Sequence, residues 1–281
     1  MNGRESGVVN TALGLARAIA GRMATEPAVT AVALGGSIAT RAGDERSDID
    51  LYVFGDAPPP VEVRRAIATA HDPRPEIGNT AFGPSDEWSD GATGIGVDLI
   101  YWSPGWIEDQ LGRVLDRHEA SVGYSTAFWF TIRHLRPHSD RDGWLGTLLA
   151  KAEQPYPEPL RRAIIALNHP LLRAARSSFL HQIDLAIARD DPVSVQHRTA
   201  ALLASYTDVL FALNRQPHPG EKRVLRQLAA RCSRLPSGFE TDVLGVLAAT
   251  AAPVERELIG RLNGLVDALD PLLDAEGFVV V

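Results

Sequence analysis

The chain has 281 residues, of which 45% are hydrophobic and 22% are charged, a balance that is typical of a globular protein and excludes wholesale disorder. It has no apolar run of the roughly 18 residues that are needed to cross a bilayer, and its first ten residues show no secretory-signal pattern. Its single cysteine, Cys232, excludes an internal disulfide. These three observations predict a soluble cytoplasmic protein that does not enter a membrane. The formal net charge is −7.

The negative charge is carried by the first half of the chain. Residues 1–156 hold 14 Lys+Arg and 21 Asp+Glu, whereas residues 157–281 hold 14 of each. Because non-specific binding of nucleic acid depends on Lys and Arg that neutralise phosphates, this distribution argues against nucleic acid as a partner. An acidic half suits a site for divalent metal ions, although an acidic surface that serves only solubility has the same charge.

Helical and strand patterns alternate along the first half. The periodicity predicts helices over residues 8–24, from the prolines at 58–60 to about residue 72, and from Pro104 to about His118. It predicts strands over residues 28–36, 47–55 and 95–102. Residues 73–95 are rich in Gly, Pro, Asp and Ser and predict a loop with at most one short strand. The segment "AFWFTIRHL" (residues 127–135) fits a strand or an apolar helix start, and its β-forming residues favour a strand.

The second half is helical throughout. Three prolines in "QPYPEP" (residues 154–159) indicate a linker, and every long segment after it has a 3.6-residue period. The sequence therefore predicts an α+β protein, with a small mixed-sheet domain over residues 1–156 and an all-α helical bundle domain over residues 157–281.

Two aspartates stand one residue apart in the stretch "GGSIATRAGDERSDIDLYVF" (residues 35–54). Side chains two apart on a strand point to the same face, so Asp48 and Asp50 present two carboxylates side by side. Two like charges this close repel unless a cation lies between them, and Mg²⁺ is held by a few carboxylates together with phosphate oxygens. The pair predicts a metal site, although an acidic pair at a solvent-exposed strand edge has the same pattern.

Two glycines and a serine precede the aspartates. Gly35 and Gly36 allow the backbone to approach a ligand closely. Ser37 stands where a short helix begins, so that its hydroxyl and the amides of the first turn face an anion placed there. A plain N-cap serine after a glycine turn is the alternative. Followed by the two aspartates, the turn predicts a phosphate site beside the metal site.

A third carboxylate, Asp98, lies in the apolar run "VDLIYW" (residues 97–102). An acid inside a buried strand is costly unless it has a partner or a metal. Two metal ions held by three aspartates and flanking phosphate oxygens would support in-line phosphoryl or nucleotidyl transfer.

A Gly-Ser turn, ten residues, a D-x-D pair and a distant third aspartate resemble the signature of the polymerase-β-type nucleotidyltransferases, over residues 30–102. With its helical second half, the chain most resembles the antibiotic (kanamycin-, streptomycin- and lincosamide-type) nucleotidyltransferases and their uncharacterised bacterial relatives. The resemblance implies that Gly36 and Ser37 hold the triphosphate of ATP or another NTP. It also implies that Asp48 and Asp50 bind two Mg²⁺ ions, Asp98 binds one of them, and Mn²⁺ can substitute.

The implied reaction moves a nucleoside monophosphate, first of all AMP, to a hydroxyl of a small molecule such as an aminoglycoside-like or lincosamide-like antibiotic, with release of pyrophosphate. The general base is left open between Asp98 and Glu221. Two other functions are open: an antitoxin-type adenylyltransferase that acts on a protein or tRNA, and a nucleotide-binding protein without turnover. The intact set of Ser37, Asp48, Asp50 and Asp98 argues against loss of activity, and the lack of a basic stripe argues against tRNA.

Two further segments have functional interpretations. Lys222, in "PGEKR" at a predicted helix start, is expected to contact the β- and γ-phosphates of the nucleotide, because a cation there opposes the helix dipole; a solvated basic turn is the alternative. Trp88 stands in the acidic segment "SDEWSD", where it could stack on a base while Asp86, Glu87 and Asp90 attract a cationic substrate. A solvated loop is the alternative. The eight histidines show no zinc-helix spacing except His134 and His138, which Pro137 separates.

Overall fold

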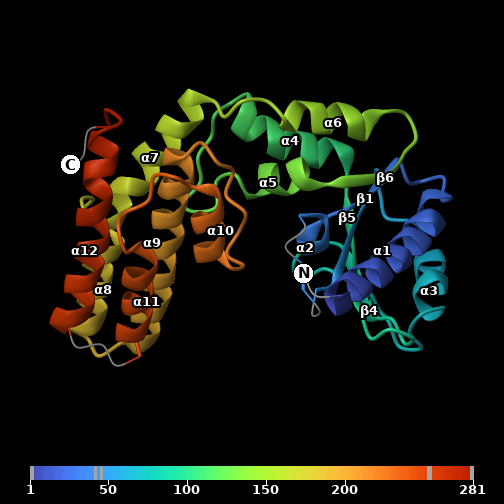
Figure 1. Ribbon diagram of the computed structural model, residues 1–281, viewed down its shortest axis with the longest axis horizontal. Helices are drawn as coiled ribbons and strands as arrows, with labels where there is room; N and C mark the ends of the chain where they lie inside the picture. The colour runs from blue at the N-terminus through green and yellow to red at the C-terminus, as the bar shows by residue number, and fades with distance from the viewer. Residues whose placement is uncertain (1–2, 41–42, 45–46, 252–254, 279–281) are drawn as a thin grey trace. The chain divides into compact units, whose positions relative to one another are not determined.

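The computed structural model describes residues 3–40, 43–44, 47–251 and 255–278. The chain forms two compact units (Figure 1). Unit 1 consists of Met1–Leu111 and Thr131–Gln154, and unit 2 consists of Gly112–Phe130 and Pro155–Val281. The chain therefore enters unit 2 for a short excursion, returns to unit 1, and then completes unit 2.

Unit 1 is built on a six-stranded mixed sheet with the strand order β3-β4-β5-β2-β1-β6. Its strands are β1 (Ala31–Leu34), β2 (Ile49–Phe54), β3 (Glu76–Asn79), β4 (Ser85–Ser89), β5 (Gly96–Trp102) and β6 (Arg136–Asp140). Only β2 and β5 run parallel among these pairs, and the remaining neighbours are antiparallel. The connection between β2 and β5 carries α3 and the β3–β4 hairpin, which supplies the length that a parallel crossover needs.

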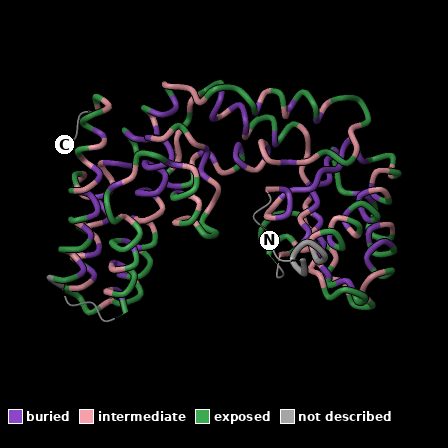
Figure 2. The backbone as a smooth tube through the Cα atoms, in the orientation of Figure 1, coloured by how far each residue is buried: buried purple, intermediate pink, exposed green. Residues whose placement is uncertain are grey.

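One face of this sheet is the core of unit 1. Ile49, Leu51 and Val53 of β2 alternate with residues of the other face, and they pack with the apolar side of α1 (Gly3–Ala24) and of α3 (Val61–Thr69). Figure 2 shows the burial along the backbone: β1 and β2 are buried along almost their whole length, β4 and β5 alternate between buried residues and more accessible ones, and β3 and β6 have no buried residue. Because β2 places every second residue in this core, its intervening residues belong to the opposite face.

The segment at residues 127–135 forms a helix, so the predicted strand is wrong. α5 (Ala127–His134) runs from unit 2 into unit 1, and Trp129 and Ile132, three residues apart, are both fully buried. The edge strand is instead the polar segment β6, which pairs with β1 although it contains Pro137. A proline is tolerated at a sheet edge because its missing N–H group leaves no ladder bond unmade on the outer side.

Two other predictions for the first half of the chain differ from the structure. Residues 73–95, predicted as a loop with at most one strand, contain the hairpin of β3 and β4. The helix from Pro104, α4, ends at Leu115 rather than near His118, and His118 has a positive φ of 55°, which a continuing helix does not allow. The remaining helices of unit 1 are α2 (Gly36–Ala39) and α6 (Trp144–Ala152).

Unit 2 is helical. Its elements are α7 (Glu158–Leu172), α8 (Phe179–Ile187), α9 (Pro192–Leu213), α10 (Val224–Arg231), α11 (Phe239–Ala249) and α12 (Glu255–Asp274). The long helix α9 packs against both α7 and α8 and is buried along most of its second half, from Ser205 to Leu213. Asp191 caps its N-terminus by accepting a hydrogen bond from the Ser194 amide.

These elements confirm the predicted α+β class, with a mixed sheet and helices in unit 1 and helices in unit 2. Within the described part of the chain, no helix combines the length and the hydropathy that a membrane crossing needs.

Candidate active site on the carboxylate face of the sheet

Asp50 and Asp98 lie directly beside each other on the sheet. The parallel register of β2 and β5 pairs Ile49 with Val97 and Asp50 with Asp98. Since paired residues of a parallel ladder point to the same face, both carboxylates stand on the face opposite the core, and both residues are half-buried. The structure therefore brings together two of the three aspartates that the sequence singled out. We call this side of the sheet the carboxylate face.

Asp48 belongs to the same face, one step before the start of β2. Its carboxylate lies against Gly96 of β5: a methyl group added at Gly96 would stand 2.4 Å from Asp48 Oδ1. Gly96 is two residues before Asp98, so it occupies the same face and leaves room for the Asp48 side chain. Gly96 is not among the residues predicted from the sequence, although a glycine two residues before an acid on a strand is a signal for it.

The Gly-Ser turn packs directly on Asp50. Gly36 has a φ of +63°, and a methyl group there would lie 1.7 Å from Asp50 Oδ2. The turn is joined to β2 by a hydrogen bond of 2.8 Å from the Gly35 amide to the Asp50 carbonyl oxygen. The N-cap of α2 is Gly35, so Ser37 is not a capping residue; its half-buried side chain has no hydrogen-bond partner among the described residues.

A fourth carboxylate extends the row across the sheet. The antiparallel register of β4 and β5 places Glu87 directly opposite Asp98, so Glu87, Asp98 and Asp50 stand side by side on three neighbouring strands. Glu87 Oε1 accepts hydrogen bonds from Asn79 Nδ2 at 3.2 Å and from Ser85 Oγ at 3.3 Å. Directly opposed like charges destabilise a sheet, so such a row favours the binding of cations.

Tyr52 marks the boundary between the charged and the apolar part of this face. It follows Asp50 by two residues, and its ring packs over Gly35 and 4.5 Å from the ring of Trp102. Burial, followed by the negative charges of Asp50 and Asp98, raises the pKa of Tyr52 well above its ordinary value. The phenol is therefore neutral beside the carboxylates, and the aromatic cluster walls one side of the carboxylate face.

The donor set suits a hard divalent cation, which prefers carboxylate oxygens. However, over residues 3–40, 43–44, 47–251 and 255–278 no group of three or more His, Cys, Asp or Glu side chains is arranged to hold a metal ion. The metal-binding roles of Asp48, Asp50 and Asp98 therefore stay predictions. The structure places the carboxylates of Asp50 and Asp98 in register, with Glu87 and Asp48 beside them. It also places the glycine turn in contact with Asp50.

The interpretation of "SDEWSD" as a substrate-contacting loop is wrong. The segment forms β4, and Trp88 is a buried core residue of unit 1. Asp86 is fully buried and accepts hydrogen bonds from Arg64, from the Tyr101 hydroxyl at 2.6 Å and from the Gly78 amide at 2.8 Å.

Asp90 is likewise a structural residue. It is buried, its Oδ1 lies 2.9 Å from His71 Nδ1, and its Oδ2 accepts a hydrogen bond of 2.7 Å from the Thr93 hydroxyl. The Thr93 hydrogen bond is the main cause that lowers the pKa of Asp90. Of the three acids in this segment, Glu87 alone lies on the carboxylate face, because strand alternation separates it from Asp86 and Trp88.

Lys222 and Glu221 belong to unit 2, in an exposed turn before α10. This turn is held by His218, whose amide donates a 2.7 Å hydrogen bond to Thr126 Oγ1 and whose Nδ1 accepts one of 3.0 Å from the Gly220 amide. Burial lowers the pKa of His218 to about 3, so the imidazole is neutral at physiological pH. The helix begins at Val224, two residues after Lys222, and the nucleotide contact of Lys222 stays a prediction.

Comparison with known proteins gives distant structural likenesses. No protein-family profile matches the chain, and no curated protein matches it. The structure is similar to the crystal structure of a nucleotidyltransferase-like protein from Exiguobacterium sibiricum, with 14% identity, a TM-score of 0.41, and coverage of 92% of this chain and 73% of that chain.

It is also similar to a STING-associated CdnE c-di-GMP synthase from Capnocytophaga granulosa, with 11% identity, a TM-score of 0.28, and coverage of 98% of this chain and 83% of that chain. Both TM-scores are below 0.5, so neither likeness assigns an activity or a substrate to this chain.

Proposed function

We propose that this protein is a divalent-metal-dependent nucleotidyltransferase that moves a nucleoside monophosphate, AMP in the first instance, from an NTP to a hydroxyl of a small molecule. The observation that carries the proposal is the contact between the Gly-Ser turn and the in-register aspartates: Gly36 packs on the carboxylate of Asp50, which stands beside Asp98. A phosphate-binding turn and a carboxylate pair in contact are what a metal-bound triphosphate needs.

Each residue has a distinct part in this proposal. Asp48, Asp50 and Asp98 hold Mg²⁺ or Mn²⁺, which when bound neutralises the phosphate oxygens and the charge that develops on them. The absence of a side chain at Gly36 lets the Asp50 carboxylate lie against the turn, and the Gly36 amide and the Ser37 hydroxyl donate hydrogen bonds to phosphate oxygens. A triphosphate cannot approach three or four carboxylates without cations between them, so nucleotide binding is expected to require the metal.

The transfer itself is an in-line displacement. The acceptor hydroxyl oxygen forms a bond to the α-phosphorus, the bond from this phosphorus to the oxygen that bridges it to the β-phosphate breaks, and pyrophosphate leaves with that electron pair. The proton of the hydroxyl passes to a general base, for which Asp98 is a candidate because it stands beside the metal-binding pair. Glu221 is the other candidate from the sequence.

The negative charge of the carboxylate face favours a cationic acceptor. Glu87 adds a carboxylate beside Asp98 on the side away from Asp50, and its oxygen is fixed by Asn79 and Ser85. A polyhydroxylated amine, such as an aminoglycoside-like compound, offers both the attacking hydroxyl and ammonium groups that pair with such carboxylates. Lincosamide-like compounds belong in the same test.

The experiment is an incubation of the purified protein with each of the common NTPs, Mg²⁺ or Mn²⁺, and a panel of aminoglycosides and lincosamides, with the mass of each acceptor and the released pyrophosphate measured. We expect the acceptor to gain one nucleoside monophosphate, and Asp50→Asn to abolish this gain. Glu62→Gln is the matched control, because Glu62 is an exposed acid of α3, away from the carboxylate face.

Nucleotide binding is measured in parallel by calorimetry, with and without EDTA. Binding that is equally tight in EDTA would contradict the metal-dependent site. Nucleotide binding without transfer to any small acceptor would direct the search to a protein acceptor. Transfer that survives in Asp50→Asn would refute the assignment of the site.

A further inference from the structure

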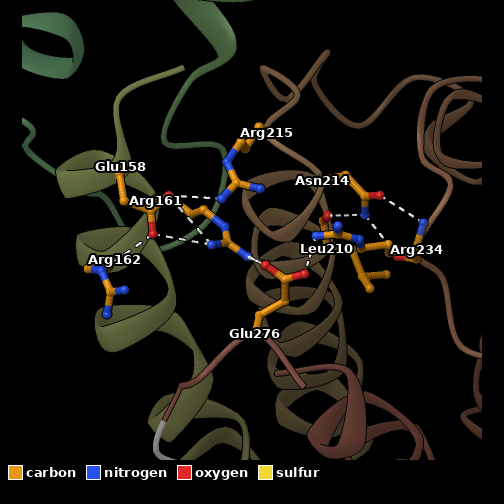
Figure 3. A network of polar contacts seen from close by, with 8 residues as sticks. All are labelled: Glu158, Arg161, Arg162, Leu210, Asn214, Arg215, Arg234 and Glu276. Carbon is orange, nitrogen blue, oxygen red and sulfur yellow. Dashed lines mark hydrogen bonds and ion pairs between the residues drawn. The ribbon is translucent and has the colours of Figure 1, made fainter. Parts of the chain in front are cut away.

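Four arginines meet around two glutamates at one end of the helices of unit 2 (Figure 3). Figure 3 shows Arg161 between Glu158 and Glu276, with Arg215 and Arg162 directed at Glu158 and Arg234 at Glu276. We call this set of six residues the arginine cluster. Three of its residues, Glu158, Arg161 and Arg162, lie at the start of α7. Arg215 follows the C-cap residue of α9, Arg234 lies in the segment after α10, and Glu276 lies in the turn after α12. All six residues belong to unit 2.

The ion pairs of the cluster are centred on Arg161, whose side chain is only 2% exposed. Arg161 Nη1 lies 3.2 Å from Glu158 Oε1, and Nη2 lies 2.8 Å from Glu276 Oε2. Its guanidinium also lies over the Phe278 ring, 4.8 Å from the ring centroid. The hydrogen bond from Arg161 is the main cause that lowers the pKa of Glu276, so both carboxylates are taken up by the buried arginine.

The three outer arginines have spare hydrogen-bond donors. Arg162 uses its Nε, 3.4 Å from Glu158 Oε1; Arg215 uses its Nη2, 3.1 Å from Glu158 Oε2; and Arg234 uses its Nη1, on Glu276 Oε1. Because a guanidinium has five N–H donors, each outer arginine keeps donors that no described residue accepts. Their side chains are 60%, 44% and 48% exposed, so these donors face solvent.

The charges of the cluster do not balance. Among the described residues, four guanidinium groups face two carboxylates, which is an excess of two positive charges within the cluster, in a protein whose net charge is −7. Among the other ion pairs of unit 2, Arg173 faces two aspartates, Asp267 and Asp270, and Arg261 faces one glutamate, Glu257, whereas Arg113 and Arg117 share one glutamate, Glu119. An excess of arginine over carboxylate therefore also occurs at Glu119, but the arginine cluster differs from it because its ion pairs are centred on a buried arginine, Arg161.

Two of the outer arginines are held by the backbone. Arg215 follows α9 with a φ of +52°, a conformation that residues other than glycine rarely adopt and that fixes where the side chain leaves the chain. Asn214 and Arg234 exchange two hydrogen bonds of 2.8 Å, from Asn214 Nδ2 to the Arg234 carbonyl oxygen and from the Arg234 amide to Asn214 Oδ1. Donors that are fixed before a ligand arrives lose little freedom on binding.

We propose that the arginine cluster binds a phosphate group with two negative charges, either as inorganic phosphate or as the phosphate monoester of a small molecule. The two charges of the anion match the excess of two guanidinium groups over carboxylates in the cluster, and its oxygens accept spare donors of Arg215 and Arg234. Arginine suits this ligand because its planar fork matches phosphate oxygens. The site is independent of the proposed transferase reaction and needs no metal.

The experiment is a calorimetric titration of the full chain with inorganic phosphate and, separately, with glycerol 3-phosphate, in EDTA and at constant ionic strength. EDTA separates this site from metal-dependent nucleotide binding. We expect saturable binding at one site per chain, and at least tenfold weaker binding in Arg215→Gln, because a charge-assisted hydrogen bond is lost. The relative affinities for the two probes distinguish a free anion from a monoester as the source.

Arg261→Gln is the matched control, because Arg261 has a similar exposure of 46% and a single carboxylate partner. It should bind phosphate as the wild-type protein does, and so should Asp50→Asn. Far-UV circular dichroism checks that each variant is folded, and Arg234→Gln replaces Arg215→Gln if the latter does not fold. Absence of saturable binding to either probe, or equal loss in Arg215→Gln and Arg261→Gln, would overturn the proposal.

Discussion

The contact between Gly36 and Asp50 can be tested by the substitution Gly36→Ala. The added methyl group would lie 1.7 Å from Asp50 Oδ2 and 2.6 Å from Asp50 Cγ, both far inside van der Waals contact. The φ of +63° at Gly36 adds backbone strain, because residues with a Cβ rarely adopt it. Either the carboxylate of Asp50 rotates away from its position or the turn moves.

The expected loss of stability follows from these two effects. A left-handed backbone conformation costs a residue other than glycine about 1–2 kcal/mol, and a side chain forced away from its rotamer costs about 0.5–1.5 kcal/mol. The free energy of unfolding of unit 1 should therefore fall by about 1.5–3.5 kcal/mol. For nucleotidyl transfer we expect a loss in kcat/KM of about 100-fold, because a misplacement of about 1 Å in a reacting constellation has that effect.

Two assays separate the two consequences. Thermal unfolding followed by circular dichroism gives the change in stability, and mass spectrometry of the acceptor gives the change in kcat/KM. Gly14→Ala is the control: Gly14 lies in α1, nothing stands within 4 Å of an added methyl group, and alanine should stabilise the helix by about 0.5–1 kcal/mol. An unchanged melting temperature in Gly36→Ala would refute the close contact with Asp50. Lower stability with wild-type kinetics would refute the role of this contact in the reaction.

Three further predictions concern single residues. Asp50→Asn should abolish transfer and keep the far-UV spectrum of the folded protein, because the carboxylate is needed to bind the metal and not to form the core. Residual activity above a few per cent of wild type would argue against this role of Asp50. Lys222→Ala should raise the KM for the nucleotide and lower kcat/KM by about 10–100-fold, since a charge-assisted phosphate contact contributes about 1.5–3 kcal/mol. The KM for the acceptor and the free energy of unfolding should change little. Unchanged nucleotide kinetics would mean that the turn is only a solvated surface feature. Burial raises the pKa of Asp208 from 3.8 to about 7, against the opposing hydrogen bonds from Ser125. Because the folded state then binds the proton more tightly than the unfolded state, the free energy of unfolding should fall as the pH rises from about 4 to about 7, by an amount on the order of 2–4 kcal/mol. Urea titrations across this pH range measure the fall, and Asp208→Asn should remove it. An equally steep pH dependence in the variant would count against this assignment.

Local sequence determined the elements that carry the candidate site. The alternation in "SDIDLYVF" places Ile49, Leu51 and Val53 in the core and Asp50 on the opposite face, as the strand period predicts. The same alternation in "GVDLIYW" separates Asp98 from Val97 and Leu99. Because the strand period is a property of the backbone, these assignments needed no knowledge of neighbouring strands.

The sequence could not decide which strands become neighbours. The order β4-β5-β2 puts Glu87, Asp98 and Asp50 in one row, although 37 positions separate the first and last of them in the chain. The segment at residues 127–135 shows the same limit: its β-forming residues favour a strand, but burial of Trp129 and Ile132 three residues apart fits a helix.

Only the tertiary structure decided between these outcomes, because each depends on a partner that is distant in the chain. β1 pairs with the polar segment Arg136–Asp140 as its edge strand, which leaves the apolar segment before it to pack as a helix. Likewise, Gly36 and Gly96 are required where they stand because the carboxylates of Asp50 and Asp48 occupy the space of their missing side chains. Strand period and helix propensity act over a few residues, whereas register and close packing are set by contacts across the fold.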